Sequence, residues 1–320
     1  MSLPTPAGRT DARLLAIGAH VPPRRVSNLE LIAAHGIERE FLERKLGVVE
    51  RAIKADGETT SDLCVRAYGD LRAAMPIEPA AIQLVCVVTQ NPDLKIPHTA
   101  AILHQRLELA RHCMSFDISQ GCAGYVHGLA IVAGLLERFD LEHALLFTCD
   151  PYSTIVDPRD RNTALLFGDA ATVSYVARPP AGGGGYALAD AVFGTAPGTT
   201  AVLRCDRVFE MDGRGVVLHA AREVPRSVRA LLDRCARTAD DIDLFLFHPG
   251  SKHIVDVLRR DLGLAEAKVP FESARYGNTV SSSIPLLLRR HLARREASRI
   301  LLGGFGVGFS WGSCLLERRP

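Results

Sequence analysis

The feature that most constrains the fold of this chain is a weak internal repeat. A shift of 156 residues places Gly121–Cys122 on Gly277–Asn278 and Ala144–Leu146 on Ile300–Leu302, with no gap between the two matches. Each copy contains a turn, a small or polar residue, a helical pattern and an apolar run. We therefore predict two similar α/β halves that pack against each other.

Apolar runs typical of buried strands alternate with helical patterns along the chain. Strands are expected at residues 14–18, 82–88, 144–149 and 242–247, and helices are expected to begin near Ser27, Glu38, Thr60 and Cys122. Alternation of this kind predicts a mainly parallel α/β core. The Pro- and Gly-rich run at residues 179–185 is typical of a linker, so we predict an N-terminal half at 1–178 and a C-terminal half at 186–320.

Composition narrows the functional classes. Of the 320 residues, 47% are hydrophobic and 23% are charged, as in a globular protein. The eight cysteines are scattered without a C-x-x-C pair, so neither a disulfide nor a bound metal is expected. A net charge of +2 without interleaved aromatic residues argues against nucleic acid. No apolar run approaches the length of a bilayer, and the first residues lack a signal pattern, so we expect a cytoplasmic protein without a membrane partner.

Cys122 is the candidate nucleophile. It follows a turn at Ser119–Gly121 and comes where small residues and an apolar helical pattern begin. The positive end of a helix dipole favours a thiolate, which attacks carbonyls and thioesters. The alternative is that Cys122 is only a small buried packing residue.

His248 and Asn278 are candidates for handling protons and stabilising negative charge. His248 comes directly after the apolar run Leu244–Phe247, where open α/β sheets bind their ligands, and the repeat puts Asn278 in the position equivalent to Cys122. A nucleophile, a proton-handling group and hydrogen-bond donors are the minimum set for acyl transfer. Alternatively, His248 is a turn residue before Pro249 and Asn278 is a helix cap.

Five ordered motifs together resemble the β-ketoacyl-acyl-carrier-protein synthase III branch of the thiolase superfamily. The motifs are Gln120–Gly124, Ala164–Ala171, His248–Gly250, Tyr276–Thr279 and Gly304–Ser313. The glycines of the last motif do not follow the G-x-G-x-x-G pattern, so a dinucleotide cofactor is not expected.

The resemblance implies a five-layered αβαβα fold, a homodimer and a two-step reaction. Cys122 would accept an acyl group from a coenzyme A or acyl-carrier-protein thioester. His248 and Asn278 would then hold a malonyl thioester while it loses carbon dioxide and attacks the acyl group. Phe305 matches the family's phenylalanine beside the nucleophile, and the N–H of Val307 matches its second oxyanion donor. No cofactor is implied beyond the thioester substrates.

Departures from the family pattern concern the substrate. Phe41 and Thr154 appear where the family carries a tryptophan and an arginine that hold the adenine of coenzyme A, which predicts weaker adenine binding. Pro249 replaces a glutamine, as in chalcone-synthase-like relatives. Both changes indicate a specialised fatty-acid or polyketide-type pathway.

Basic residues after His248 are candidate contacts for an acidic carrier protein: Lys252, Arg259 and Arg260.

The sequence is also compatible with two other functions. The first is acyl transfer from Cys122 to an oxygen or nitrogen nucleophile, against which the presence of Asn278 argues, because such a transfer has no enolate to stabilise. The second is a non-catalytic subunit that shapes the active site of another synthase, against which the presence of Cys122 argues.

Overall fold

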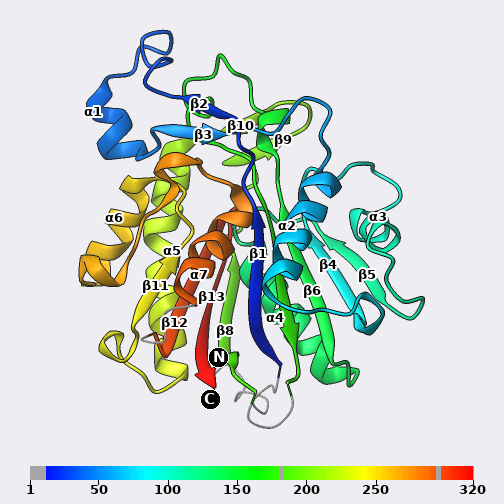
Figure 1. The fold of residues 1–320 in the computed structure, drawn as a ribbon. Coiled ribbons are helices and arrows are strands. Elements are labelled where there is room, and N and C mark those ends of the chain that lie inside the picture. The colour runs from blue at the N-terminus through cyan, green and yellow to red at the C-terminus, as the bar shows by residue number, and fades with distance from the viewer. Residues whose placement is uncertain (1–11, 180–182, 293–296, 320) are drawn as a thin grey trace.

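The computed structural model describes residues 12–179, 183–292 and 297–319 (Figure 1). Nine strands run through the molecule in the order β11-β12-β13-β8-β1-β7-β6-β4-β5. They are β1 (Arg13–His20), β4 (Leu84–Val88), β5 (Met114–Ile118), β6 (His143–Cys149), β7 (Ala171–Ala177), β8 (Gly185–Thr195), β11 (Leu244–Phe247), β12 (Arg299–Gly306) and β13 (Ser310–Arg319). Because β1 pairs with β8 only at Arg13 and Leu14, the strands form two sheets that are joined at one corner.

The two sheets share one pairing order. In the first, β4 runs parallel to β6, and β7 is antiparallel to both β6 and β1. In the second, β11 runs parallel to β12, and β13 is antiparallel to both β12 and β8. This shared order is the structural basis of the sequence repeat. The predicted boundary near residue 179 falls between β7 and β8, partly outside the described residues, and stays a prediction.

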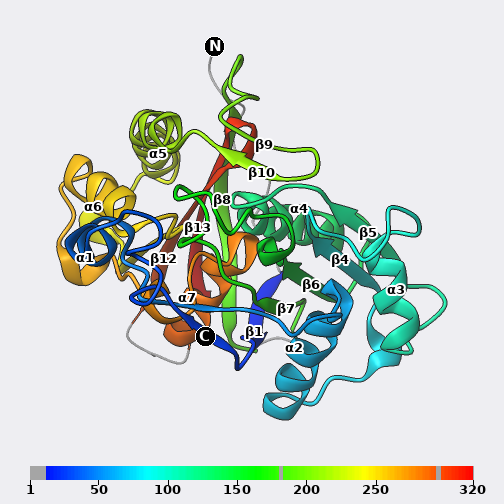
Figure 2. The same ribbon diagram turned by 90° about the horizontal axis from the view of Figure 1, so that it is seen from above.

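Helices form three layers around the two sheets. They are α1 (Arg39–Phe41), α2 (Thr60–Ala74), α3 (Thr99–Arg106), α4 (Gly124–Arg138), α5 (Gly213–Arg234), α6 (Lys252–Asp261) and α7 (Ser283–Leu292). Helices α4 and α7 lie between the sheets, where Leu129 and Leu287 share one core with Leu146 and Leu302 of the strands. Helices α2 and α3 cover the outer face of the first sheet, and α5 and α6 cover that of the second (Figure 2). The arrangement confirms the predicted αβαβα fold.

The start of α4 is held close to the first sheet by a glycine. A Cβ atom on Gly124 would lie 2.3 Å from Cγ1 of Val88 in β4, so a larger residue would push the helix away. Overpacking at such a site costs about 1–3 kcal/mol. The preceding residues, Gly121–Ala123, are thereby fixed against the end of the sheet.

The segments outside the sheets differ in part from expectation. The helix predicted near Ser27 is wrong: β2 (Arg25–Ser27) pairs with β3 (Glu50–Ala52), and turns follow. The buried Asn28 side chain donates to the carbonyls of Val48 (3.0 Å) and Leu165 (2.7 Å), which ties this segment to two distant ones. The helix predicted at Glu38–Lys45 is confirmed as α1 with a π-helical turn at Leu42–Leu46. A second small pair, β9 (Leu203–Cys205) and β10 (Phe209–Met211), follows β8.

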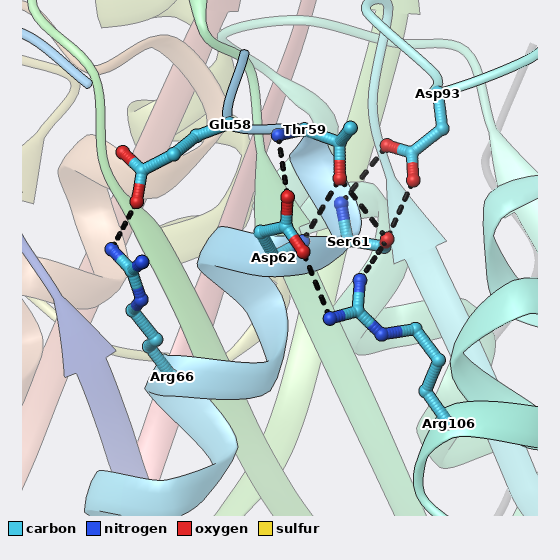
Figure 3. Close-up of polar contacts among 7 residues, drawn as sticks. All are labelled: Glu58, Thr59, Ser61, Asp62, Arg66, Asp93 and Arg106. Carbon is cyan, nitrogen blue, oxygen red and sulfur yellow. Dashed lines mark hydrogen bonds and ion pairs between the residues drawn. The ribbon is translucent and has the colours of Figure 1, made fainter. Parts of the chain in front are cut away.

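A polar cluster ties the loop after β4 to the first turn of α2 (Figure 3). Asp93 accepts hydrogen bonds from the backbone N–H of Ser61 (3.0 Å) and from its hydroxyl (2.5 Å), and Arg106 of α3 donates to Ser61 and Asp62. The loop at residues 91–98 is therefore anchored, although its apolar tip is exposed.

Candidate active site

Cys122 lies in the turn between β5 and α4. The N–H of Gly124 donates to the carbonyl of Gly121 (2.7 Å), which closes the turn around Cys122, and the residue as a whole is partly exposed. Strand β12 passes close by: a Cβ on Gly306 would lie 2.8 Å from Cβ and 3.3 Å from Sγ of Cys122. A glycine at position 306 is therefore required for the strand to approach the nucleophile.

The protonation state of Cys122 differs from the expectation based on the helix dipole. Burial raises the pKa of the thiol above its ordinary value, and the nearby carboxylate of Asp150 raises it further. Loss of solvent thus destabilises the thiolate of Cys122 more than the helix N-terminus stabilises it. At rest Cys122 is a neutral thiol, and its proton must be removed during acyl transfer.

His248 follows β11 as predicted. Its backbone N–H donates to the carbonyl of Gly303 in β12 (2.8 Å), and its ring meets the ring of Phe305 edge-on, with centroids 5.6 Å apart. The side chain is buried, and Nδ1 has no hydrogen-bond partner among the described residues. Burial lowers the pKa of His248 to about 3, so the imidazole is neutral at physiological pH.

Asn278 is fixed by bonds on both sides. Its backbone N–H donates to the carbonyl of Leu166 (2.9 Å), and its carbonyl accepts from the N–H of Gly168 (3.0 Å). The side-chain oxygen Oδ1 accepts from the N–H of Val280 (2.9 Å). Because Oδ1 is engaged with the backbone, the Nδ2 donor is the part of the amide that is available to a ligand.

One cavity of about 1180 Å³ brings the predicted residues together. Cys122, His248, Asn278, Phe305 and Val307 all line it. They come from both halves of the chain, from the ends of β11 and β12 and from the turns before α4 and α7. The repeat therefore predicted correctly that Cys122 and Asn278 face a shared space.

The apolar wall of this cavity was not predicted from the sequence. The rings of Tyr152, Phe167 and Phe209 lie with centroids 5.0–5.3 Å apart, and all three residues line the cavity. Cys122 packs against the same apolar cluster. A wall of this kind suits the hydrocarbon part of an acyl group.

Of the three residues predicted at the entrance, one lines this cavity and two do not. Phe41 lines the cavity and is 46% exposed, as expected at its mouth. Thr154 does not line the cavity, and its hydroxyl donates to the carbonyl of Pro151 (2.7 Å). Lys252 does not line it either, and its ammonium is 3.1 Å from the carboxylate of Asp256. The exposed Arg161, which was not predicted, lines the cavity with Phe41.

A second cavity of about 590 Å³ adjoins the mouth, between α1 and α6. It shares Phe41, Lys45 and His253 with the first cavity, and it also contains Arg259 and Arg260. Three acidic residues also line this cavity: Glu38, Glu40 and Asp256. Within the described part of the chain, none of the carboxylates forms an ion pair with Lys45, Arg259 or Arg260.

Two further properties of the described residues concern membranes and metal ions. Across residues 12–179, 183–292 and 297–319, no helix is both long and apolar enough to cross a membrane. In the same ranges, no group of three or more His, Cys, Asp or Glu side chains is arranged to hold a metal ion.

Comparison with known proteins identifies the family. The family 3-oxoacyl-[acyl-carrier-protein] synthase III matches residues 116–197, and its C-terminal counterpart matches residues 232–318. Two relatives are β-ketoacyl-[acyl-carrier-protein] synthases III. The one from Neisseria meningitidis serogroup C is 30% identical over 96% of this chain and 99% of its own length, and the one from Deinococcus deserti is 31% identical over 95% and 91%.

Solved structures agree with this assignment. The 3-oxoacyl-(acyl carrier protein) synthase III from Pseudomonas aeruginosa PAO1 superposes with a TM-score of 0.88 at 31% identity, covering 97% of this chain and 98% of that one. The priming β-ketosynthase of the R1128 polyketide biosynthetic pathway gives 0.87 at 28% identity, covering 99% and 98%. The fold and the cavity define a condensing enzyme of the thiolase type. The chain belongs to the 3-oxoacyl-[acyl-carrier-protein] synthase III family.

Proposed function

We propose that the chain transfers an acyl group to Cys122 and then condenses it with a malonyl thioester, with loss of carbon dioxide. The observation that carries this proposal is the shared cavity, in which a thiol, a neutral imidazole and an amide donor meet beside an apolar wall.

In the first step the Cys122 thiol attacks the carbonyl carbon of the acyl donor. His248 takes the thiol proton and returns it to the departing thiol of coenzyme A or of the carrier protein. The N–H groups of Cys122 and Val307 stabilise the negative charge that develops on the carbonyl oxygen. The acyl chain then lies against Tyr152 and Phe167.

In the second step the malonyl thioester occupies the same cavity. Its thioester oxygen accepts hydrogen bonds from His248 and from Nδ2 of Asn278, which stabilise the enolate that forms as carbon dioxide leaves. The enolate carbon attacks the carbonyl carbon of the acyl group, the carbon–sulfur bond to Cys122 breaks, and Cys122 leaves as a thiolate that takes a proton from solvent. A neutral His248 suits this step, because it must donate a hydrogen bond and not carry a charge.

The mouth of the cavity bears on the form of the donor. Phe41 and Arg161 supply an aromatic ring and a guanidinium, the two groups that hold a planar base by stacking. These two groups support adenine binding, and we propose a coenzyme A thioester as acyl donor in place of the weaker adenine binding expected from Thr154. For the malonyl group we propose an acyl carrier protein, whose acidic surface would meet Lys45, Arg259 and Arg260.

We also propose that the enzyme is a homodimer. Strand β5 is the edge of the first sheet, and its Ser115 is 3.2 Å from His98, at the end of the loop that exposes Leu94 and Ile96. An unpaired edge beside exposed apolar side chains is typical of an interface.

A specialised polyketide-type role is supported by the similarity to the R1128 priming ketosynthase.

Intact-protein mass spectrometry tests the first step. The wild type and Cys122→Ala are incubated with acyl-coenzyme A thioesters of increasing chain length, and malonyl-carrier protein is then added. We expect an acyl adduct on the wild type alone, followed by its discharge as a 3-oxoacyl product. An adduct that malonyl-carrier protein leaves in place, but an alcohol or amine removes, would show acyl transfer instead.

A further inference from the structure

A buried carboxylate lies beneath the catalytic cavity, outside the set of residues used above. Asp150 follows β6 directly and is fully buried. Its Oδ1 accepts the backbone N–H of Gln90 (2.6 Å), and its Oδ2 accepts the hydroxyl of Ser281. A buried carboxylate is costly unless each of its oxygens is hydrogen-bonded, so both partners are required.

One of these bonds leads to the Cys122 turn. Gln90 comes after β4, and its side-chain Oε1 accepts the hydroxyl of Tyr152 (2.8 Å). The same Oε1 lies 2.5 Å from the position that a Cβ on Gly121 would take, so Gln90 packs directly against the residue before Cys122. Asp150 also acts on the thiol electrostatically, because its charge opposes formation of the Cys122 thiolate.

The other bond leads to the Asn278 turn. Ser281 is three residues after Asn278, and between them Val280 has φ = 53°. The left-handed conformation is strained for a β-branched residue and persists only where neighbouring contacts hold it. Here it directs the Val280 N–H to Oδ1 of Asn278 (2.9 Å), and the bond from Ser281 to Asp150 holds the residue that follows.

We propose that Asp150 is a positioning residue for the condensation: it joins the Cys122 turn to the Asn278 turn and sets the spacing between the nucleophile and the amide donor. Gln90 belongs to the N-terminal part of the chain and Ser281 to the C-terminal part, so Asp150 connects the two parts directly beneath the reaction. The role of Asp150 in placing the Asn278 amide for condensation rests on the proposed function. Its opposition to formation of the Cys122 thiolate does not.

Two substitutions separate charge from hydrogen bonding. Asp150→Asn keeps the shape, because its Oδ1 can accept from Gln90 while its Nδ2 donates to the Ser281 hydroxyl, but it removes the negative charge. Ser281→Ala keeps the charge and removes the bond to the Asn278 turn. Ser313→Ala is the matched control: Ser313 is equally buried in β13, with a 2.9 Å bond to Ser227 of α5.

The first measurement is the pH dependence of iodoacetamide alkylation at Cys122, followed by peptide mass mapping because other cysteines are also accessible. Since the carboxylate opposes thiolate formation, Asp150→Asn should speed alkylation at every pH at which Cys122 is still mainly a thiol, whereas Ser281→Ala and Ser313→Ala should leave the rate unchanged. An unchanged rate in Asp150→Asn would overturn the electrostatic part of the proposal, whether or not the enzyme condenses malonyl thioesters.

The second measurement compares the two half-reactions. Ser281→Ala should slow carbon dioxide release from the malonyl thioester by about 10- to 100-fold, because a misplaced donor has an effect of that order, while acylation of Cys122 stays near the wild-type rate. Equal rates in Ser281→Ala and Ser313→Ala would overturn the positioning role. If Asp150→Asn fails to fold, as thermal unfolding would reveal, the Ser281→Ala result decides. A wild type that acylates but releases no carbon dioxide would contradict the proposed function instead.

Discussion

His248 shows how burial sets the chemistry of a single residue. Because its folded-state pKa of about 3 lies below the ordinary 6.5, we predict that its imidazole stays neutral from pH 8 to pH 5. Histidine NMR titration, with the signal assigned by its loss in His248→Gln, measures this directly. A titration midpoint between 6 and 7 would contradict the assignment of a neutral hydrogen-bond donor.

The same shift links stability to pH. Below about pH 6.5 the unfolded chain takes up a proton at His248 that the folded chain excludes. The stability contributed by the neutral imidazole is therefore complete above that pH and falls as the pH is lowered towards 3. We expect the free energy of unfolding of the wild type to decrease relative to His248→Gln between pH 7 and pH 5, as measured by urea unfolding.

Gly306 tests the close approach of β12 to the nucleophile. A methyl group at this position would lie 2.8 Å from Cβ of Cys122, so Gly306→Ala should slow acylation of Cys122 by about 10- to 100-fold. Gly134→Ala is the control. Gly134 is exposed on α4 with nothing within 4 Å of an added Cβ, so alanine there should stabilise the helix by about 0.5–1 kcal/mol without changing the rate. Equal acylation rates in the two variants would refute the argument.

At the scale of elements, α6 presents the basic side chains that we assign to the carrier protein. Replacing Arg259 and Arg260 together by Glu should raise KM for malonyl-carrier protein several-fold and weaken its dependence on salt, with little change for a malonyl-coenzyme A substrate. Arg138→Glu, at the far end of the 15-residue α4, is the control. A similar rise in KM for both malonyl substrates would contradict docking of the carrier on α6.

Elements that depend on local pattern were predictable from the sequence. The buried strands β4 and β6 and the helices α2 and α4 follow from apolar periodicity, and the repeat placed Cys122 and Asn278 in equivalent turns. The helix predicted near Ser27 failed because Asn28 bonds to Val48 and Leu165, which are distant in sequence. Local pattern does not contain that information.

The entrance of the cavity was harder to predict for a related reason. Thr154 was predicted because it was matched to the arginine of the family, but its side chain bonds back to Pro151, and after Tyr152 the next residue that lines the cavity is Arg161. Similarly, Tyr152, Phe167 and Phe209 form one wall from three separate segments. Only the three-dimensional path of the loops brings these residues together.

At the scale of the whole molecule, the exposed loop tip and the β5 edge carry the dimer proposal. Ile96 is 87% exposed although it is apolar, and the polar contacts at Asp93 anchor its loop. We expect light scattering to give about twice the 34.7 kDa chain mass, and Ile96→Asp to shift the protein towards monomer. A monomeric wild type across micromolar concentrations would refute the homodimer.

The central claim is that two half-reactions share one cavity and His248 but differ in their need for Cys122 and Asn278. The most direct test measures acylation and carbon dioxide release separately in the wild type, Cys122→Ala and Asn278→Ala. We predict that Cys122→Ala forms no acyl adduct yet still decarboxylates the malonyl thioester, whereas Asn278→Ala forms the adduct and loses decarboxylation by about 100-fold or more. Decarboxylation by Asn278→Ala at the wild-type rate would contradict the account.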